Sequence, residues 1–130
     1  MQTKIFTAEL LERDKNALKE AADIIRQGGL VAFPTETVYG LGADATDATA
    51  AKKIYAAKGR PSDNPLIIHV SEPRDAELYA HTCELYYKLA EAFMPGPLTV
   101  IMPKRDTIPD GVTGGLDSVA VRCPSHSVAR

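Results

Sequence analysis

The segment KGRPSDNPL, residues 58–66, places two cations and an amide, Lys58, Arg60 and Asn64, within seven residues of each other. Lys58 falls in the last turn of an expected helix, where a cation also complements the helix dipole, so the helix alone could explain it. Arg60 lies beyond that helix, and its planar guanidinium suits phosphate. Pro65 biases Asn64 towards extended backbone, although an ordinary turn residue remains an equal explanation. The segment favours binding of a phosphate group.

Polar side chains also follow an expected buried strand, LVAF at residues 30–33. Thr35, Glu36 and Thr37 come almost directly after it, at the carboxyl end of the strand, where α/β sheets collect their ligands. His69 interrupts a second apolar strand, and both a satisfied core histidine and a ring that faces a pocket remain open. The sequence therefore predicts a ligand site at the ends of these strands.

The loop after residue 37 contains Gly40 and Gly42, for which we expect positive φ and a close approach of the backbone to a ligand. The string from Gly40 to Ala45 fits the dinucleotide pattern G-x-G-x-x-A. Its context does not fit, because several residues separate it from the strand and a helix begins only after Asp47. The P-loop pattern G-x-x-x-x-G-K-[ST] is absent from the sequence. A bound nucleotide would need another means of holding its phosphates.

The segment SVAVRC, residues 118–123, alternates as a strand. Ser118, Ala120 and Arg122 then share one face, with Ser118 and Arg122 about 13 Å apart. An elongated ligand could contact both ends of this face.

The elements that must position these residues follow from local patterns. Apolar positions at helical spacing, with Asp14 and Asp47 as N-caps, predict two helices. Short apolar runs bounded by Pro and Gly predict strands. We expect one α/β (α+β) domain over residues 1–130, with a twisted mixed sheet flanked by helices at 15–27, 48–58, 73–81 and 83–94, and strands at 30–33, 66–70, 98–102 and 118–123.

Composition excludes several classes of protein. The 130 residues carry a net charge of −2, with 45% hydrophobic residues, which is typical of a globular protein and gives no overall attraction to nucleic acid or membrane. Two unpatterned cysteines and no long apolar run predict a reduced, cytoplasmic protein. The three histidines lack metal-ligand spacing, so no protein-held metal is expected. The basic patch of the chain is local, and within it we expect Lys52 and Lys53 to point to solvent.

Four blocks together, PTETVYGLGA, KGRPSDNPLIIHV, PGPLTVIM and GGLDSVAVRCPSH, resemble the YrdC/TsaC family of threonylcarbamoyl-AMP synthases. The resemblance implies a single YrdC-like α/β domain with a concave, positively charged cleft. It also implies the family's reaction, in which L-threonine, bicarbonate and ATP give threonylcarbamoyl-AMP and pyrophosphate for modification of tRNA. Carried over by position, it implies that Thr37, His69 and Arg122 bind threonine.

For ATP the resemblance implies Lys58, Arg60, Asn64 and Ser118, with Lys58 and Arg60 as catalytic cations that neutralise the crowded phosphates. Mg²⁺ would arrive with ATP. The further partners implied are tRNA and a downstream tRNA threonylcarbamoyl transferase. Two alternatives stay open: an RNA-binding module that uses the same basic cleft, and a relative that transfers a carbamoyl group to another acceptor.

Members of the family continue beyond the position of Arg130, so the resemblance implies a domain truncated at its C-terminal end. Ser125 could cap a final helical turn. We therefore expect a bare strand edge or an apolar patch beside Val119 and Val121, and little product formation by the 130-residue chain alone.

Overall fold

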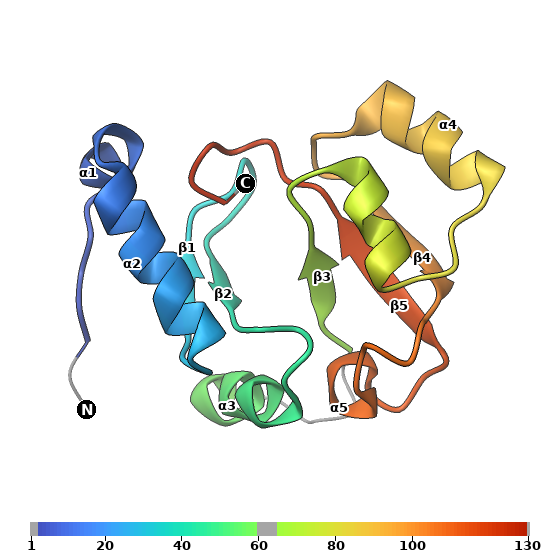
Figure 1. The fold of residues 1–130 in the computed structure, drawn as a ribbon, viewed down its shortest axis with the longest axis horizontal. Helices are drawn as coiled ribbons and strands as arrows, with labels where there is room; N and C mark the ends of the chain where they lie inside the picture. The colour runs from blue at the N-terminus through green and yellow to red at the C-terminus, as the bar shows by residue number, and fades with distance from the viewer. Residues whose placement is uncertain (1–2, 60–64, 130) are drawn as a thin grey trace.

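The computed structural model describes residues 3–59 and 65–129, which form an α/β arrangement of short strands flanked by helices (Figure 1). The strands are β1 (Val31–Phe33), β2 (Gly40–Gly42), β3 (Ile67–His69), β4 (Thr99–Pro103) and β5 (Ser118–Arg122). The α-helices are α1 (Ala8–Arg13), α2 (Lys15–Arg26), α3 (Ala48–Lys58), α4 (Glu84–Phe93) and α5 (Asp110–Thr113), and a 3₁₀-helix, η1, spans Pro73–Leu78.

Helices α2 and α3 begin and end where the sequence predicts. The carboxylate of Asp14 accepts a hydrogen bond from the backbone N–H of Asn16, and that of Asp47 accepts from Thr49 and Ala50. These bonds satisfy amide groups that have no partner within the helix. Helix α3 ends at Gly59, whose φ of 62° and ψ of 29° are left-handed, a conformation that glycine adopts without steric cost.

Strands β1 and β2 form an antiparallel hairpin, with Val31 opposite Gly42 and Phe33 opposite Gly40. The expectation of a glycine loop with positive φ is wrong, because neither Gly40 nor Gly42 has positive φ and both lie in β2. A Cβ on Gly42 would lie 2.7 Å from the ring of Phe33, and one on Gly40 would lie 3.2 Å from it. The glycines therefore make room for this aromatic ring across the hairpin.

The larger sheet is mixed, with strand order β3-β5-β4. Strand β3 runs parallel to β5 and β4 runs antiparallel to it, as the predicted mixed sheet requires. Val119 and Val121 of β5 are buried in the core with Ile68 and Met102. The expected bare edge or apolar patch beside Val119 and Val121 is wrong, because β5 is the central strand and these side chains pack inward.

The segment 73–81 forms a 3₁₀-helix and then pairs with β4, where the sequence predicts one helix. The backbone N–H of His81 donates to the carbonyl of Pro103 at 2.8 Å, and Ala80 bridges Lys104. This long-range pairing ends the helical segment. At the end of the described chain, residues 127–129 make a turn rather than a regular helix.

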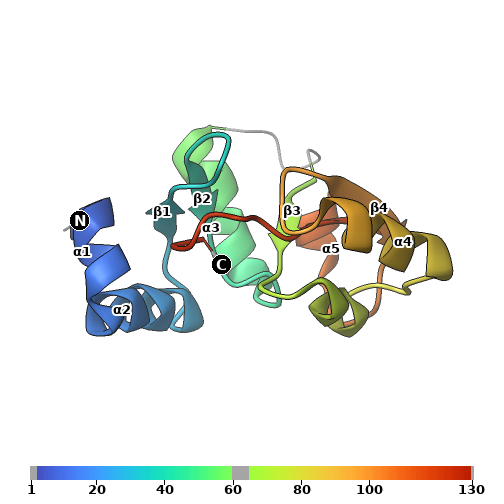
Figure 2. The same ribbon diagram turned by 90° about the horizontal axis from the view of Figure 1, so that it is seen from above.

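In space the hairpin and the mixed sheet stand side by side, with α2 on the side of the hairpin away from the sheet (Figures 1 and 2). Residues 123–129 run from the end of β5 back to the loop of the hairpin (Figure 1). The two β units are thus connected at the end where β3 and β5 finish.

Within the described ranges, every helix is too short or too polar to cross a membrane.

Candidate functional site

Arg122 is the centre of a polar cluster at the carboxyl ends of β3 and β5. The register places Arg122 opposite His69 in β3 and opposite Thr99 in β4, so the three side chains share one face of the sheet. The guanidinium Nε of Arg122 donates to the carbonyl of Gly96 at 3.3 Å, and Nη1 and Nη2 each lie 3.5 Å from Oγ1 of Thr37. The hairpin loop and the sheet therefore meet at this side chain.

The loop that carries Thr37 is built by the hydroxyl of Thr35. Its Oγ1 donates to the carbonyl of Val38 at 2.6 Å and accepts from the backbone N–H groups of Thr37 and Val38 at 3.3 and 3.2 Å. A threonine hydroxyl that bonds the backbone two and three residues ahead stabilises a tight turn. Thr35 thus shapes the turn that presents Thr37 to Arg122.

Glu36 joins three segments of the chain. Its Oε1 forms an ion pair with Nη2 of Arg122, and its Oε2 accepts from the backbone N–H and the hydroxyl of Ser125. The Arg122 and Glu36 side chains are only 12% and 21% exposed. Because water screens a partly buried pair less than an exposed one, the attraction between these two charges depends less on salt than that of an ordinary surface salt bridge.

His69 faces the open side of the sheet and does not sit in the core. Its ring packs edge-on against Phe33 with centroids 5.8 Å apart, and its Nδ1 lies 3.3 Å from the carbonyl of Ile67. Desolvation by these neighbours lowers the pKa of His69, and the contact with Ile67 opposes this shift in part. At neutral pH the ring is therefore neutral, a hydrogen-bonding group and not a charge.

The residues predicted to bind ATP are only partly described. Ser118 begins β5, at the end of the sheet remote from Arg122, opposite Pro103. Lys58 is the exposed last residue of α3. Arg60 and Asn64 lie outside the described residues. The side chain of Lys58 forms neither a hydrogen bond nor an ion pair with the other described residues.

One prediction about the basic patch is wrong. Lys52 is exposed, but the ammonium of Lys53 donates to the carbonyl of Gly28 at 2.7 Å, where the chain leaves α2. That carbonyl lies just past the end of the helix and needs a donor. Lys53 therefore ties α3 to α2 and does not simply point to solvent.

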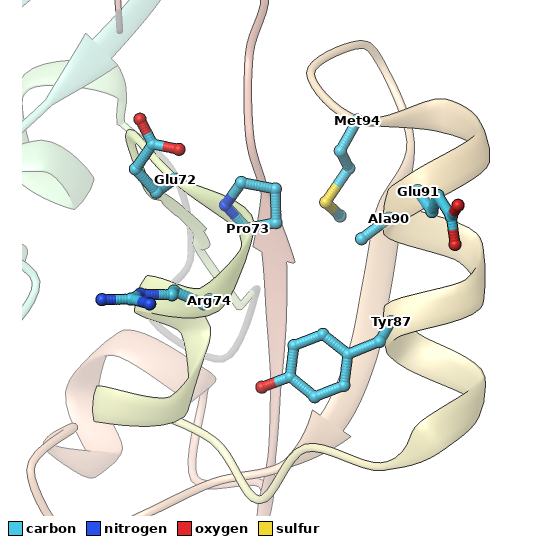
Figure 3. Close-up of a pocket in the computed structure, with 7 residues that line it drawn as sticks. All are labelled: Glu72, Pro73, Arg74, Tyr87, Ala90, Glu91 and Met94. Carbon is cyan, nitrogen blue, oxygen red and sulfur yellow. The ribbon is translucent and has the colours of Figure 1, made fainter.

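Of two surface hollows in the described part of the chain, one borders the cluster and the other does not. The larger, about 350 Å³, lies between η1 and α4 (Figure 3) and contains none of the predicted site residues; it is lined by Glu72, Pro73, Arg74, Tyr87, Ala90, Glu91 and Met94. The hydroxyl of Tyr87 is already bonded to Glu77. The second, about 310 Å³, has His69 on its wall. The larger hollow therefore lies away from the residues with convergent chemistry, and we place the candidate site by those residues.

The fold brings together Thr37, His69 and Arg122, although Thr37 and Arg122 are 85 positions apart in the sequence. It adds Gly96 and Ser125, to which the sequence assigns no binding role, and gives Glu36 a definite partner. The signal for this pair in the sequence was a carboxylate, Glu36, just after one expected strand and an arginine, Arg122, near the end of another. The cluster offers a cation, an anion, a hydroxyl and a neutral imidazole on one open surface, a set suited to a small polar ligand carrying both charges.

Comparison with known proteins assigns most of the chain to a known family. The Sua5/YciO/YrdC family model, described as telomere recombination, matches residues 23–130. A threonylcarbamoyl-AMP synthase from Pyrococcus abyssi is 55% identical over 113 residues, covering 86% of this chain and 33% of the relative. The corresponding enzyme of Bacillus subtilis is 49% identical over 125 residues, covering 95% of this chain and 36% of the relative.

The crystal structure of P. abyssi Sua5 in complex with L-threonine superposes with a TM-score of 0.87 at 53% identity, covering 89% of this chain and 34% of that protein. The chain thus spans about a third of the length of these relatives. The family model covers far more than half of the chain, and the fold agrees with it. From these matches and the shared fold, the chain belongs to the Sua5/YciO/YrdC family.

Proposed function

We propose that this chain carries the threonine-binding surface and part of the ATP-binding surface of an L-threonylcarbamoyladenylate synthase. The observation that carries the proposal is the meeting of Arg122 with Thr37, from the hairpin, on the sheet face that it shares with His69. Its support from relatives is that two similar proteins are threonylcarbamoyl-AMP synthases and that a similar structure holds L-threonine.

In this proposal Arg122 donates to the carboxylate of threonine, because a guanidinium binds a carboxylate through two parallel N–H groups. Thr37 and neutral His69 exchange hydrogen bonds with the remaining polar groups of the amino acid. Their lack of charge suits a site that must accept a neutral hydroxyl. The residues gathered around Arg122 thus define the amino-acid end of the site.

The nucleotide end lies towards the start of β5 and the end of α3. Lys58, Arg60, Asn64 and Ser118 would bind ATP, which brings its own Mg²⁺ as part of the substrate. The threonine amine and bicarbonate give a carbamate and water, and a carbamate oxygen then bonds the α-phosphorus as pyrophosphate leaves. Lys58 and Arg60 would offset the negative charge of the phosphates during this step. Ser118 and Arg122 lie about 13 Å apart along β5, which suits a substrate pair meeting between them.

Calorimetry with threonine, serine and valine tests the amino-acid assignment directly on this chain. We expect threonine to bind at least about tenfold more tightly than either analogue, because each lacks one group that the site recognises. Equal affinities for the three amino acids would remove the assignment. Binding of tRNA without any binding of threonine would favour the alternative of an RNA-binding module.

Release of pyrophosphate tests the nucleotide end. In the active protein that carries this chain, release should depend on threonine and bicarbonate, and Lys58→Ala should lower it by at least about tenfold, the effect of one lost charge-assisted contact. The matched control is Lys52→Ala, since Lys52 is exposed on the same helix. Unchanged turnover in Lys58→Ala would exclude a role for this lysine. Delivery of the product to a tRNA-modifying transferase in the cytoplasm is part of the same proposal.

A further inference from the structure

Glu36 is a partly buried carboxylate beside the proposed carboxylate-binding arginine. Its Oε1 contacts Nη2 of Arg122, while two donors of Ser125, a backbone N–H and a hydroxyl, hold its Oε2. Among the described residues, Glu36 is the acidic side chain that forms an ion pair with Arg122. Thr37 and His69, the other members of the cluster, carry no charge at neutral pH.

A free amino acid brings two charges to such a surface. Its α-ammonium is separated from its carboxylate by a single carbon atom, so a carboxylate bound to Arg122 places the ammonium close to the groups that flank the guanidinium. Glu36 flanks it directly, through Nη2. A carboxylate oxygen has about two acceptor sites, so Oε1 can contact Arg122 and still accept from a second donor.

Ser125 fixes the carboxylate for this role. Because its two donors occupy Oε2, the carboxylate plane is held and Oε1 is kept on the Arg122 side. Such a fixed group loses little conformational entropy when a ligand binds. The pair therefore presents a positive and a negative group side by side, which complements a zwitterion and does not complement a simple anion.

We propose that Glu36 is a specificity-determining residue that binds the α-ammonium group of the amino-acid substrate. The inference rests on the proposed threonine site and adds a requirement to it, namely that the ligand must carry a charged amine next to its carboxylate. An ion pair that only ties the hairpin loop to β5 would make no such distinction. The two roles differ in a measurable ratio of affinities.

The experiment compares L-threonine with 2,3-dihydroxybutanoate of the same configuration, in which a hydroxyl replaces the amine. Calorimetry on the unaltered protein should show at least about tenfold tighter binding of threonine, the effect of one charge-assisted hydrogen bond. Glu36→Gln keeps the size and most hydrogen bonds of the side chain but removes its charge. In this variant the ratio of the two affinities should fall to within about twofold of one.

Glu36→Gln also changes the charge around Arg122 and so alters the binding of any carboxylate. Because both ligands carry a carboxylate, this effect cancels in the ratio of their affinities. Glu84→Gln is the matched control, since Glu84 is an exposed residue of α4 that pairs with Lys88 within that helix; its ratio should stay within about twofold of the original. If Glu36→Gln weakens both ligands equally, Glu36 only positions Arg122 and the inference is wrong.

The comparison of threonine with 2,3-dihydroxybutanoate on the unaltered protein needs no variant. It therefore tests the inference even if Glu36→Gln does not fold. Equal binding of the two ligands would overturn the role of Glu36 and leave the threonine site intact. Failure of threonine itself to bind would instead remove the proposed function, and this inference with it.

Discussion

The two faces of the sheet formed by β3, β5 and β4 differ in what covers them. On one face Ile68, Val119, Val121 and Met102 pack into a core with residues of η1, α4 and α5. On the other face Ile67 and Ile101 remain exposed, and the sheet residues of the candidate site lie on this same face. Strand β5 contributes to both, because buried and half-buried residues alternate along it.

This difference separates stability from binding at the level of single residues. Side chains that alternate along one strand belong to different environments, so substitutions at neighbouring positions can affect different properties of the protein. The buried face should determine the free energy of unfolding, and the open face should determine ligand affinity. Four predictions test this separation.

The largest effect should be the difference in unfolding free energy when an isoleucine is replaced by alanine on one face or on the other. Ile68 is 3% exposed and Ile101 is 71% exposed. Ile68→Ala should lower the free energy of unfolding by about 2–5 kcal/mol, because it leaves a cavity in the core. Ile101→Ala should change it by no more than about 0.5 kcal/mol. Urea denaturation of both variants measures the contrast, and similar losses would show that the two faces are not distinct.

Arg122→Lys tests the open face. Lysine keeps the positive charge but cannot reproduce the guanidinium contacts with Gly96, Thr37 and Glu36. We expect threonine affinity to fall at least tenfold, or about 1.4 kcal/mol, in calorimetry. Arg26→Lys is the control, since Arg26 is an exposed residue of α2 whose partner among the described residues is Asp23, within the same helix. Unchanged affinity in Arg122→Lys would contradict the assignment.

A smaller effect is expected at Tyr86, on the buried side. Burial, with a smaller contribution from Cys123, raises the pKa of Tyr86 to about 12, so its hydroxyl is a neutral donor at ordinary pH. It donates to the carbonyl of Pro73 at 2.6 Å. Tyr86→Phe should cost about 0.5–1.5 kcal/mol of unfolding free energy in denaturant titrations, with threonine affinity unchanged. A loss of affinity without a loss of stability would reverse the proposed division.

The smallest effect concerns pH. Desolvation lowers the pKa of His69 below its usual 6.5, so the folded chain binds this proton less well than the unfolded chain. Stability from this group is fully present above pH 6.5 and declines as the pH falls below it, towards the folded pKa. His69→Gln should therefore show a shallower loss of unfolding free energy between about pH 7 and pH 5. Identical slopes for the two proteins would exclude the shift.

The parts of the fold that could be predicted are those with local causes. Helices α2 and α3 follow from apolar spacing, aspartate caps and, for α3, a terminal glycine, all within one short segment. The alternation of β5 likewise follows from its own residues and correctly places Ser118 and Arg122 on one face. The short elements α1, β2 and α5 have too few residues to show a period, and sequence reasoning missed them.

The partners of these elements could not be predicted in the same way. Gly40 and Gly42 suggested an open loop because the ring that covers them belongs to Phe33, across a hairpin that the pattern does not reveal. Val119 and Val121 suggested an exposed edge because alternation gives the face of a side chain but not the order of the strands.

The sequence by itself determined the residue types available for binding, the helices with their caps and the faces of the strands. Only the tertiary structure decided that Glu36 would meet Arg122 and Ser125, since these contacts join residues 86 and 89 positions apart in the chain. The physical reason is that a local pattern fixes backbone conformation within a few residues. The pairing of distant charges instead depends on which strands lie side by side and on which end of the sheet their connecting loops meet.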